Sequence, residues 1–107
     1  MPKSNERSSG SHAVRVKWVR AALLNLSTEA DYIARDNPDA AERVVDMILD
    51  ATERLKRHPG LGRPGRVTGT RELVVPGTPY IIPYRVHTGV VEIIRVFHAS
   101  RKWPRHF

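Results

Sequence analysis

The chain of 107 residues has no cysteine, no long apolar run and few aromatic residues. The absence of cysteine excludes disulfides, thiolate chemistry and Cys-based zinc sites, and it fits a protein of the reducing cytoplasm. No apolar run approaches the roughly 20 residues that a membrane-spanning helix needs. We therefore expect a cytoplasmic protein without membrane contact.

The first twelve residues are small and polar and lack the apolar stretch of a secretory signal. We expect a disordered leader over residues 1–12 and a single folded domain over residues 13–107. A hydrophobic content of 40% is enough for a modest core in a chain of this length.

Positive charge is unevenly distributed along the chain, which carries a net charge of +7. Residues 1–19 contribute +3, residues 20–58 contribute −2 and residues 59–107 contribute +6. A basic C-terminal half beside a mildly acidic central part predicts attraction to a polyanion or to an acidic protein, although solubility alone is a simpler explanation.

The first folded segments change from a period of two to a helical period. Residues 13–19 alternate apolar and basic side chains, which predicts a half-buried strand. From Arg20 to about Arg35, apolar residues recur at steps of three and four, which predicts an amphipathic helix. Its expected core face consists of Leu23, Leu26, Ala30 and Ile33, with Asn25, Ser27, Glu29 and Asp31 largely off that face.

The pair Asn37-Pro38 predicts the start of a second helix, with Asn37 as N-cap and Pro38 at the first helical position. This helix is expected to run to about Arg57 and to end before Pro59-Gly60. Its expected core face consists of Ala41, Val44, Ile48, Ala51 and Leu55. The two helices should form a hairpin that packs on a sheet.

Three β-rich runs follow, Arg71–Val75, Tyr80–Val86 and Val90–Phe97, separated by short Gly-containing breaks. Such spacing predicts a three-stranded antiparallel meander. Pro83 cannot donate a ladder hydrogen bond, so it indicates an edge position or a bulge. Residues 61–69, rich in glycine and arginine, are expected to form a basic loop. Trp18, Tyr32, Tyr80 and Tyr84 are expected in the core or at its rim.

Four sequence motifs follow one another along the chain: DNPDAAERV, LGRPGRV-x-GTRELVV, GTPYIIPYRV and RVFHASRKWP. In this combination the chain resembles the RelE/ParE superfamily of toxins from type II toxin–antitoxin (plasmid stabilisation) modules. The resemblance covers about residues 13–104 and implies an α+β fold of order β-α-α-β-β-β, with a helical hairpin packed on a twisted, mainly antiparallel sheet. It also implies a toxin that arrests growth without a cofactor and is neutralised by a cognate antitoxin, which in this family typically has a disordered segment that folds around the toxin.

The superfamily contains two mechanisms, and the residues favour one of them. RelE-like members cut messenger RNA on the ribosome and tend to carry cations along the second strand and directly after an aromatic residue in the third. Here the matching positions are Leu73, Val74 and Val75, and Ile81 after Tyr80. The chain therefore resembles the ParE-like branch more than the RelE-like branch. Members of the ParE-like branch typically inhibit DNA gyrase by binding it. The ending Arg-x-Trp-Pro points the same way.

Each candidate site residue has a functional and a structural interpretation. Arg63, Arg66 and Arg71 suit a patch that binds phosphates or carboxylates, or they keep the loop soluble. Arg101 and Lys102 suit contact with phosphate or an acidic antitoxin, or they form a solvated tail.

Two further candidates, His98 and Arg85, belong to the nuclease alternative together with Arg101. For His98 a hydrogen bond to the neighbouring backbone is favoured over proton transfer. For Arg85 an ion pair with Glu72 or Glu92 is favoured. Trp103 is a candidate for target binding that more simply packs on the sheet edge. No spacing of His and carboxylates indicates a metal site. Without the resemblance, a small basic nucleic-acid-binding module and a metal-free ribonuclease would compete.

Overall fold

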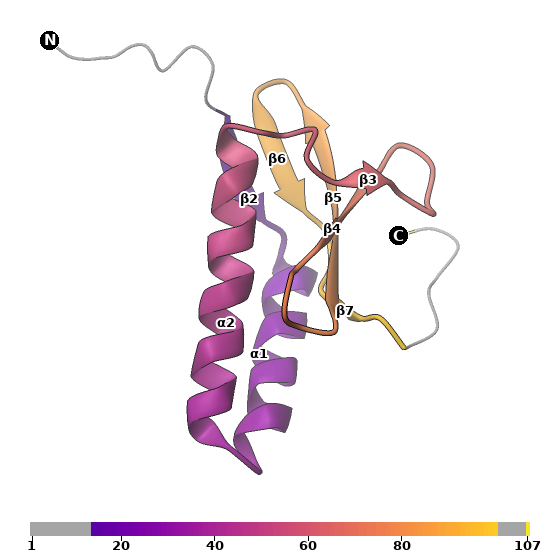
Figure 1. Ribbon diagram of the computed structural model, residues 1–107. Helices are drawn as coiled ribbons and strands as arrows, with labels where there is room; N and C mark the ends of the chain where they lie inside the picture. The colour runs from indigo at the N-terminus through magenta and orange to yellow at the C-terminus, as the bar shows by residue number, and fades with distance from the viewer. Residues whose placement is uncertain (1–13, 101–106) are drawn as a thin grey trace, which may run out of the picture.

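The computed structural model describes residues 14–100 and residue 107 of the chain (Figure 1). A strand and two long helices come first and a run of strands follows, as the sequence predicts. The elements are β2 (Arg15–Trp18), α1 (Arg20–Ala34), α2 (Pro38–Glu53), the 3₁₀ turn η1 (Arg54–Lys56), β3 (Arg63–Pro64), β4 (Arg71–Val74), β5 (Tyr80–His87), β6 (Val90–Ile93) and β7 (Phe97–His98). In this part of the chain no helix is both long and apolar enough to span a membrane.

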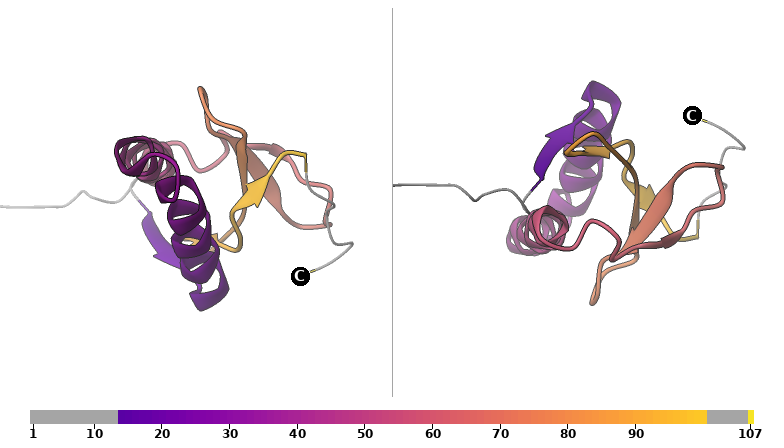
Figure 2. Two further views of the ribbon diagram at one scale, coloured as in Figure 1. Left: turned by 90° about the horizontal axis from the view of Figure 1, so that it is seen from below. Right: turned by 90° about the horizontal axis from the view of Figure 1, so that it is seen from above.

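The strands form one sheet in the order β2-β6-β5-β4-β3, and β7 pairs with β5. Every pairing is antiparallel except that of β2 with β6, which is parallel. Both helices lie on the same side of the sheet (Figure 2). The predicted α+β architecture, a helical hairpin on a mainly antiparallel sheet, is confirmed.

The predicted last strand, Val90–Phe97, is interrupted opposite Pro83. Tyr84 pairs with Ile93 and Ile81 pairs with Phe97, so three steps along β5 face four steps along the partner, which is the extra residue of a bulge. The Ile94 N–H donates to the Pro83 carbonyl at 3.0 Å, but Pro83 has no N–H to return. The prediction of a bulge at Pro83 is correct and that of an edge position is wrong, since β5 is central.

Helix α2 begins as predicted, because the Ala40 N–H donates to the Asn37 side chain at 3.1 Å and Pro38 occupies the first turn. Its predicted core face is confirmed, with Ala41, Ile48, Ala51 and Leu55 buried and Val44 packed against the core. The helix proper ends at Glu53 and η1 completes it.

Helix α1 follows the prediction only in part: Leu26 and Ile33 pack against the core as expected, but other residues of its predicted face do not. Leu23 is 51% exposed, whereas Ala22 and Glu29 are buried. The Tyr80 hydroxyl donates to Glu29 at 3.0 Å, and the Val96 N–H donates to the Asn25 side chain at 3.1 Å. Two polar residues expected off the core face are therefore turned toward the sheet, where each has a partner.

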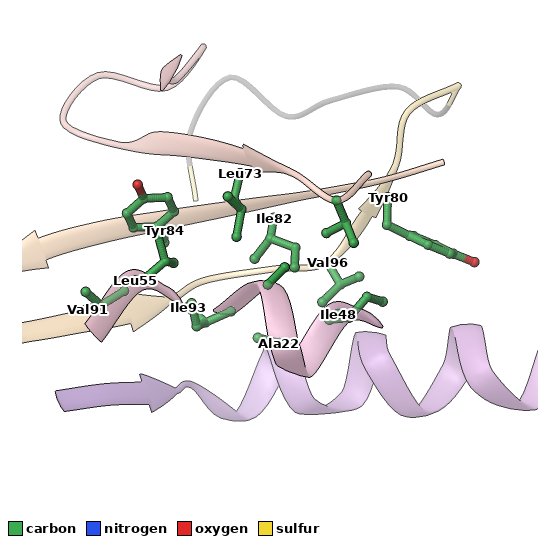
Figure 3. Packing of buried hydrophobic residues seen from close by; sticks show 12 residues of the cluster. Ala22, Ile48, Leu55, Leu73, Tyr80, Ile82, Tyr84, Val91, Ile93 and Val96 are labelled. Atoms are coloured by element: carbon green, nitrogen blue, oxygen red, sulfur yellow. The ribbon is translucent and has the colours of Figure 1, made fainter. Parts of the chain in front are cut away.

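The core lies between the helices and the sheet (Figure 3). It combines α2 with alternate residues of the central strands, among them Ile48, Leu55, Leu73, Ile82, Tyr84, Val91 and Ile93. Tyr80 and Tyr84 are buried and Trp18 packs against this cluster, as predicted. Tyr32 is 61% exposed, so its prediction as a core or rim residue is wrong; the Arg35 guanidinium lies 5.9 Å from its ring.

Candidate functional site

The predicted basic loop is an ordered arch held by one buried carboxylate. Glu72 on β4 is 2% exposed, and its carboxylate accepts from Arg63 Nε at 3.2 Å, from Arg63 Nη2 at 3.1 Å and from the Arg66 N–H at 2.8 Å. The Arg66 guanidinium lies 3.8 Å from the second carboxylate oxygen. Arg63 also opens the short strand β3 within a region predicted to be only a loop. We call residues 59–66 the arginine loop.

The base of the arginine loop is fixed by Tyr84 and Arg71. The Tyr84 hydroxyl donates to the Pro59 carbonyl at 2.8 Å and accepts from the Gly62 N–H at 2.8 Å, which uses both of its hydrogen-bonding roles. Arg71 Nη1 donates to the Gly62 carbonyl at 2.8 Å. A Cβ atom at Gly62 would lie 2.7 Å from the Tyr84 ring, so only glycine fits there.

Burial raises the pKa of Tyr84 above 10.0, although the Gly62 N–H and the nearby Arg71 charge oppose the shift. Because the folded state holds this proton more tightly than the unfolded state, the resulting stability is present below pH 10 and is lost as the pH rises further. We expect the free energy of unfolding of the wild type to fall as the pH rises above about 10, the usual pKa of tyrosine. The same measurement on Tyr84→Phe should show a smaller fall, and equal falls would contradict this assignment.

The arginine loop presents cations in fixed positions. Arg63 and Arg66 are paired with Glu72, yet about half of each side chain remains exposed, 51% and 50%. Together with Arg71 and Glu72, the arginine loop carries three arginines and one glutamate, which gives a net charge of +2. Because the guanidinium groups are held in place, they lose less conformational freedom when they bind a carboxylate or phosphate. The structure thus brings the three predicted loop arginines together.

Arg85 lies apart from this group. It pairs with Glu92, directly opposite on β6, at 3.6 Å, which is one of the two predicted partners. His87 Nε2 lies 4.0 Å from the same carboxylate. Glu72, the other predicted partner, pairs instead with Arg63 and Arg66 of the arginine loop.

His98 lies on β7, where its ring packs edge-on against Tyr80 at 5.6 Å. Its Nδ1 faces the Ser100 N–H at 3.3 Å and the Ser100 hydroxyl at 2.8 Å. A backbone N–H can only donate, so Nδ1 is the acceptor in the contact with the Ser100 N–H. The favoured prediction, a hydrogen bond to the neighbouring backbone, agrees with this geometry.

A groove runs beside the arginine loop, between α2 with η1 and the outer edge of β4. One end is a pocket of about 320 Å³, and a smaller hollow of about 140 Å³ continues along α2. The two share three lining residues, Ala51, Arg54 and Pro76. Leu61 and Val74 are the exposed apolar side chains at the first pocket, 52% and 47% exposed. We call this feature the β4-edge groove.

Arg101, Lys102 and Trp103 lie outside the described residues. In the part of the chain that the structure describes, no group of three or more His, Asp or Glu side chains could hold a metal ion.

The residues that sequence reasoning missed are those with distant partners. The sequence indicates Glu72 only as a possible partner of Arg85, although an acid between Arg71 and the aliphatic run 73–75 is a signal for a buried partner of the preceding arginines. The sequence predicts Tyr84 in the core or at its rim, but not its role in holding residues 59–62. Asn25 and Glu29, which dock α1 on the sheet, gave no periodic signal at all.

Comparison with known proteins identifies the family of this chain. The family model for the ParE toxin of the type II toxin–antitoxin system parDE matches residues 16–103. The chain belongs to the ParE toxin family. It is 48% identical over 91 residues to toxin Y4kP of Sinorhizobium fredii, covering 85% of this chain and 94% of that protein. It is 38% identical over 87 residues to toxin RelE2 of Caulobacter vibrioides, covering 81% and 97%.

Two solved structures show the same fold. The chromosomal ParDE toxin–antitoxin system from P. aeruginosa contains a chain with a TM-score of 0.76 and 30% identity, covering 84% of this chain and 100% of that one. The toxin–antitoxin complex RelBE2 from Mycobacterium tuberculosis contains one with a TM-score of 0.56 and 27% identity, covering 84% and 97%. The predicted membership of the RelE/ParE superfamily of type II toxins is confirmed.

Proposed function

We propose that this ParE-family toxin arrests growth in the cytoplasm by binding and inhibiting DNA gyrase, and that a cognate antitoxin neutralises it. The observation that supports the proposal is that aliphatic residues occupy the positions where RelE-like nucleases tend to carry cations. Leu73, Val75 and Ile81 occupy three of these positions, and all three are buried. They contribute to packing in the sheet and core, and a cation there would be buried at high cost.

The described arginines also fit recognition better than catalysis. Arg63 and Arg66 are paired with Glu72, and Arg85 is paired with Glu92. Pairing with a carboxylate fixes a guanidinium group but partly neutralises the charge it could give to a phosphorane. An arginine-rich loop beside an apolar groove has instead the composition of a protein-binding surface, with Arg at the rim and aliphatic side chains within.

The rival function is ribosome-dependent cleavage of messenger RNA, with His98, Arg101 and Arg85 as its active residues. It is favoured by the similarity to toxins named RelE2 and to the RelBE2 complex. Purified toxin should inhibit supercoiling by gyrase or trap cleaved DNA under the gyrase proposal. Codon-phased cuts in translated messenger, with gyrase unaffected, would instead support the nuclease.

Substitution in the C-terminal segment separates the two functions. We expect Arg101→Ala or Trp103→Ala to raise the toxin concentration for half-inhibition of gyrase by about tenfold, because Arg and Trp anchors dominate protein interfaces. His98→Ala should change it less than about threefold, since no proton transfer is required. If His98→Ala alone abolished toxicity while the protein remained folded, the nuclease would replace the gyrase inhibitor.

The proposal also makes a genomic prediction. A reading frame next to the toxin gene should encode an antitoxin with an acidic or amphipathic tail, and co-expression should restore growth. A gene neighbourhood without such a frame, together with no neutralising partner, would count against the whole module, including its role in plasmid stabilisation.

A further inference from the structure

Strand β2 forms the edge of the sheet opposite to β3, and among the described strands it pairs only with β6. The Arg15 N–H donates toward β6, to the Gly89 carbonyl at 3.0 Å. The Val14 N–H donates to the other side, to the Lys56 carbonyl at 3.0 Å. Because backbone groups alternate along a strand, the Val16 N–H also points outward, where no described strand lies to accept from it.

A hollow of about 470 Å³ lies along this outer edge. It contains three cationic side chains and no acidic one, since its lining consists of Val14, Arg15, Val16, Lys17 and Lys56. The side chains of Arg15 and Lys17 are exposed, and neither has an ion pair with any described residue. We call this feature the β2-edge hollow.

Two carboxylates lie near the β2-edge hollow without neutralising it. Glu53 pairs with Lys56 at 2.8 Å, but the two side chains are 61% and 44% exposed, so the pair contributes little energy and leaves the lysine accessible. Glu92 lies opposite Lys17 in the register of the sheet but pairs with Arg85 at 3.6 Å. The three cations of the hollow and Arg85 thus outnumber the two carboxylates, which leaves a net charge of +2.

The composition of the β2-edge hollow fits a phosphate backbone better than a protein partner. Protein interfaces are centred on apolar and aromatic anchors, but none of the large, exposed apolar side chains of the described chain lies on β2 or η1. Phosphates are bound by Lys and Arg side chains and by backbone N–H groups, which the hollow offers together. Arg15 and Lys17 are two residues apart on the strand, about 6.6 Å, a length over which one DNA strand carries about two phosphates.

We propose that the β2-edge hollow binds the phosphate backbone of duplex DNA without reading its sequence. Arg15 and Lys17 contact neighbouring phosphates of one strand, and Lys56 contacts a further phosphate together with the outward N–H of Val16. The hollow lies at the other end of the sheet from the arginine loop, so DNA held here leaves that loop open to a protein. The choice of duplex DNA rests on the proposed function, because DNA is the substrate of gyrase.

Fluorescence polarisation of a labelled DNA duplex of about 20 base pairs tests the proposal, with full-length toxin as the titrant and no gyrase present. We expect a dissociation constant on the order of 1–100 µM near physiological salt. Arg15→Gln/Lys17→Gln should raise it by about tenfold and reduce the slope of log affinity against log salt by about 2, because two phosphate contacts are lost. Unchanged affinity and slope in this variant overturn the proposal.

Arg35→Gln/Arg43→Gln is the matched control, because it removes the same charge from two exposed residues. Arg35 caps the end of α1, and Arg43 lies about 15 Å along α2 from the end of that helix next to η1. The dissociation constant of this variant should stay within about threefold of wild type. Equal losses of affinity in the two double variants would mean that DNA is attracted by net charge alone, and this result overturns the site.

Two further probes test the kind of ligand. Equal or tighter binding of duplex RNA of the same length overturns the assignment to DNA, and tighter binding of a polyglutamate peptide assigns the hollow to an acidic protein instead. The outcomes also separate this inference from the proposed function. If the toxin inhibits gyrase but does not bind the DNA duplex, only this inference fails. If the duplex binds at the β2-edge hollow and gyrase is unaffected, the gyrase proposal fails and this inference stands.

Discussion

Gly62→Ala is expected to lower the free energy of unfolding by about 3 kcal/mol, near the upper end of the usual cost of overpacking. An added Cβ would lie 2.7 Å from Tyr84 Cε1 and 2.8 Å from both the Glu72 carbonyl oxygen and the Tyr84 hydroxyl. Two of these contacts involve the buried tyrosine and one involves the backbone of β4, so none can move freely. The loop must shift, and the hydrogen bond from the Gly62 N–H to Tyr84 is then lost.

Gly60→Ala provides the matched control, because a Cβ atom there meets nothing within 4 Å. Its free energy of unfolding should stay within about 1 kcal/mol of wild type. Thermal unfolding should show the difference clearly, since each kcal/mol shifts the midpoint by about 4–8 °C in a domain of this size. Equal midpoints for Gly62→Ala and Gly60→Ala would show that the loop does not pack as described.

Glu72→Ala is expected to cost about 3 kcal/mol, because removing one partner of a buried pair leaves the others without compensation. The Arg66 N–H would lose its acceptor, and the charges of Arg63 and Arg66 would repel each other across the arginine loop. Glu72→Gln keeps the volume and one acceptor oxygen, so it should cost about half as much.

Glu92→Ala is the control for Glu72→Ala. Glu92 also pairs with an arginine, but it is more exposed, so its loss should cost no more than about 1 kcal/mol. Chemical denaturation of the three variants gives the comparison. Similar losses for Glu72→Ala and Glu92→Ala would mean that the arginine loop is not held by its buried carboxylate.

The local parts of the fold were accessible from the sequence because their causes are local. Asn37 and Pro38 determine the start of α2 within a few residues, and the apolar period of α2 identifies its buried face. The bulge opposite Pro83 follows from one missing N–H. The turn between β5 and β6 needs only Thr88 and Gly89, both with positive φ, 44° and 72°.

The orientation of α1 and the structure of the candidate site depend on distant partners. Glu29 is fixed by Tyr80, 51 residues away, and Asn25 by the backbone of Val96, 71 residues away. The apolar period of α1 by itself predicts Leu23 on the core face, because no pattern within α1 reveals that two polar residues have partners on the sheet. The loop arginines follow from the composition of this segment, but their common partner Glu72 and the groove beside β4 arise only from the packing of β4 against the loop and α2.

The most direct test of binding without catalysis is a titration of purified toxin against a fixed amount of gyrase, with translating ribosomes treated in parallel. We predict that supercoiling decreases in proportion to added toxin and that inhibition is complete near equal numbers of toxin molecules and gyrase binding sites, while ribosome-bound messenger stays intact. Messenger cut in phase with codons at toxin levels far below those of the ribosomes, with supercoiling unchanged, would contradict this account.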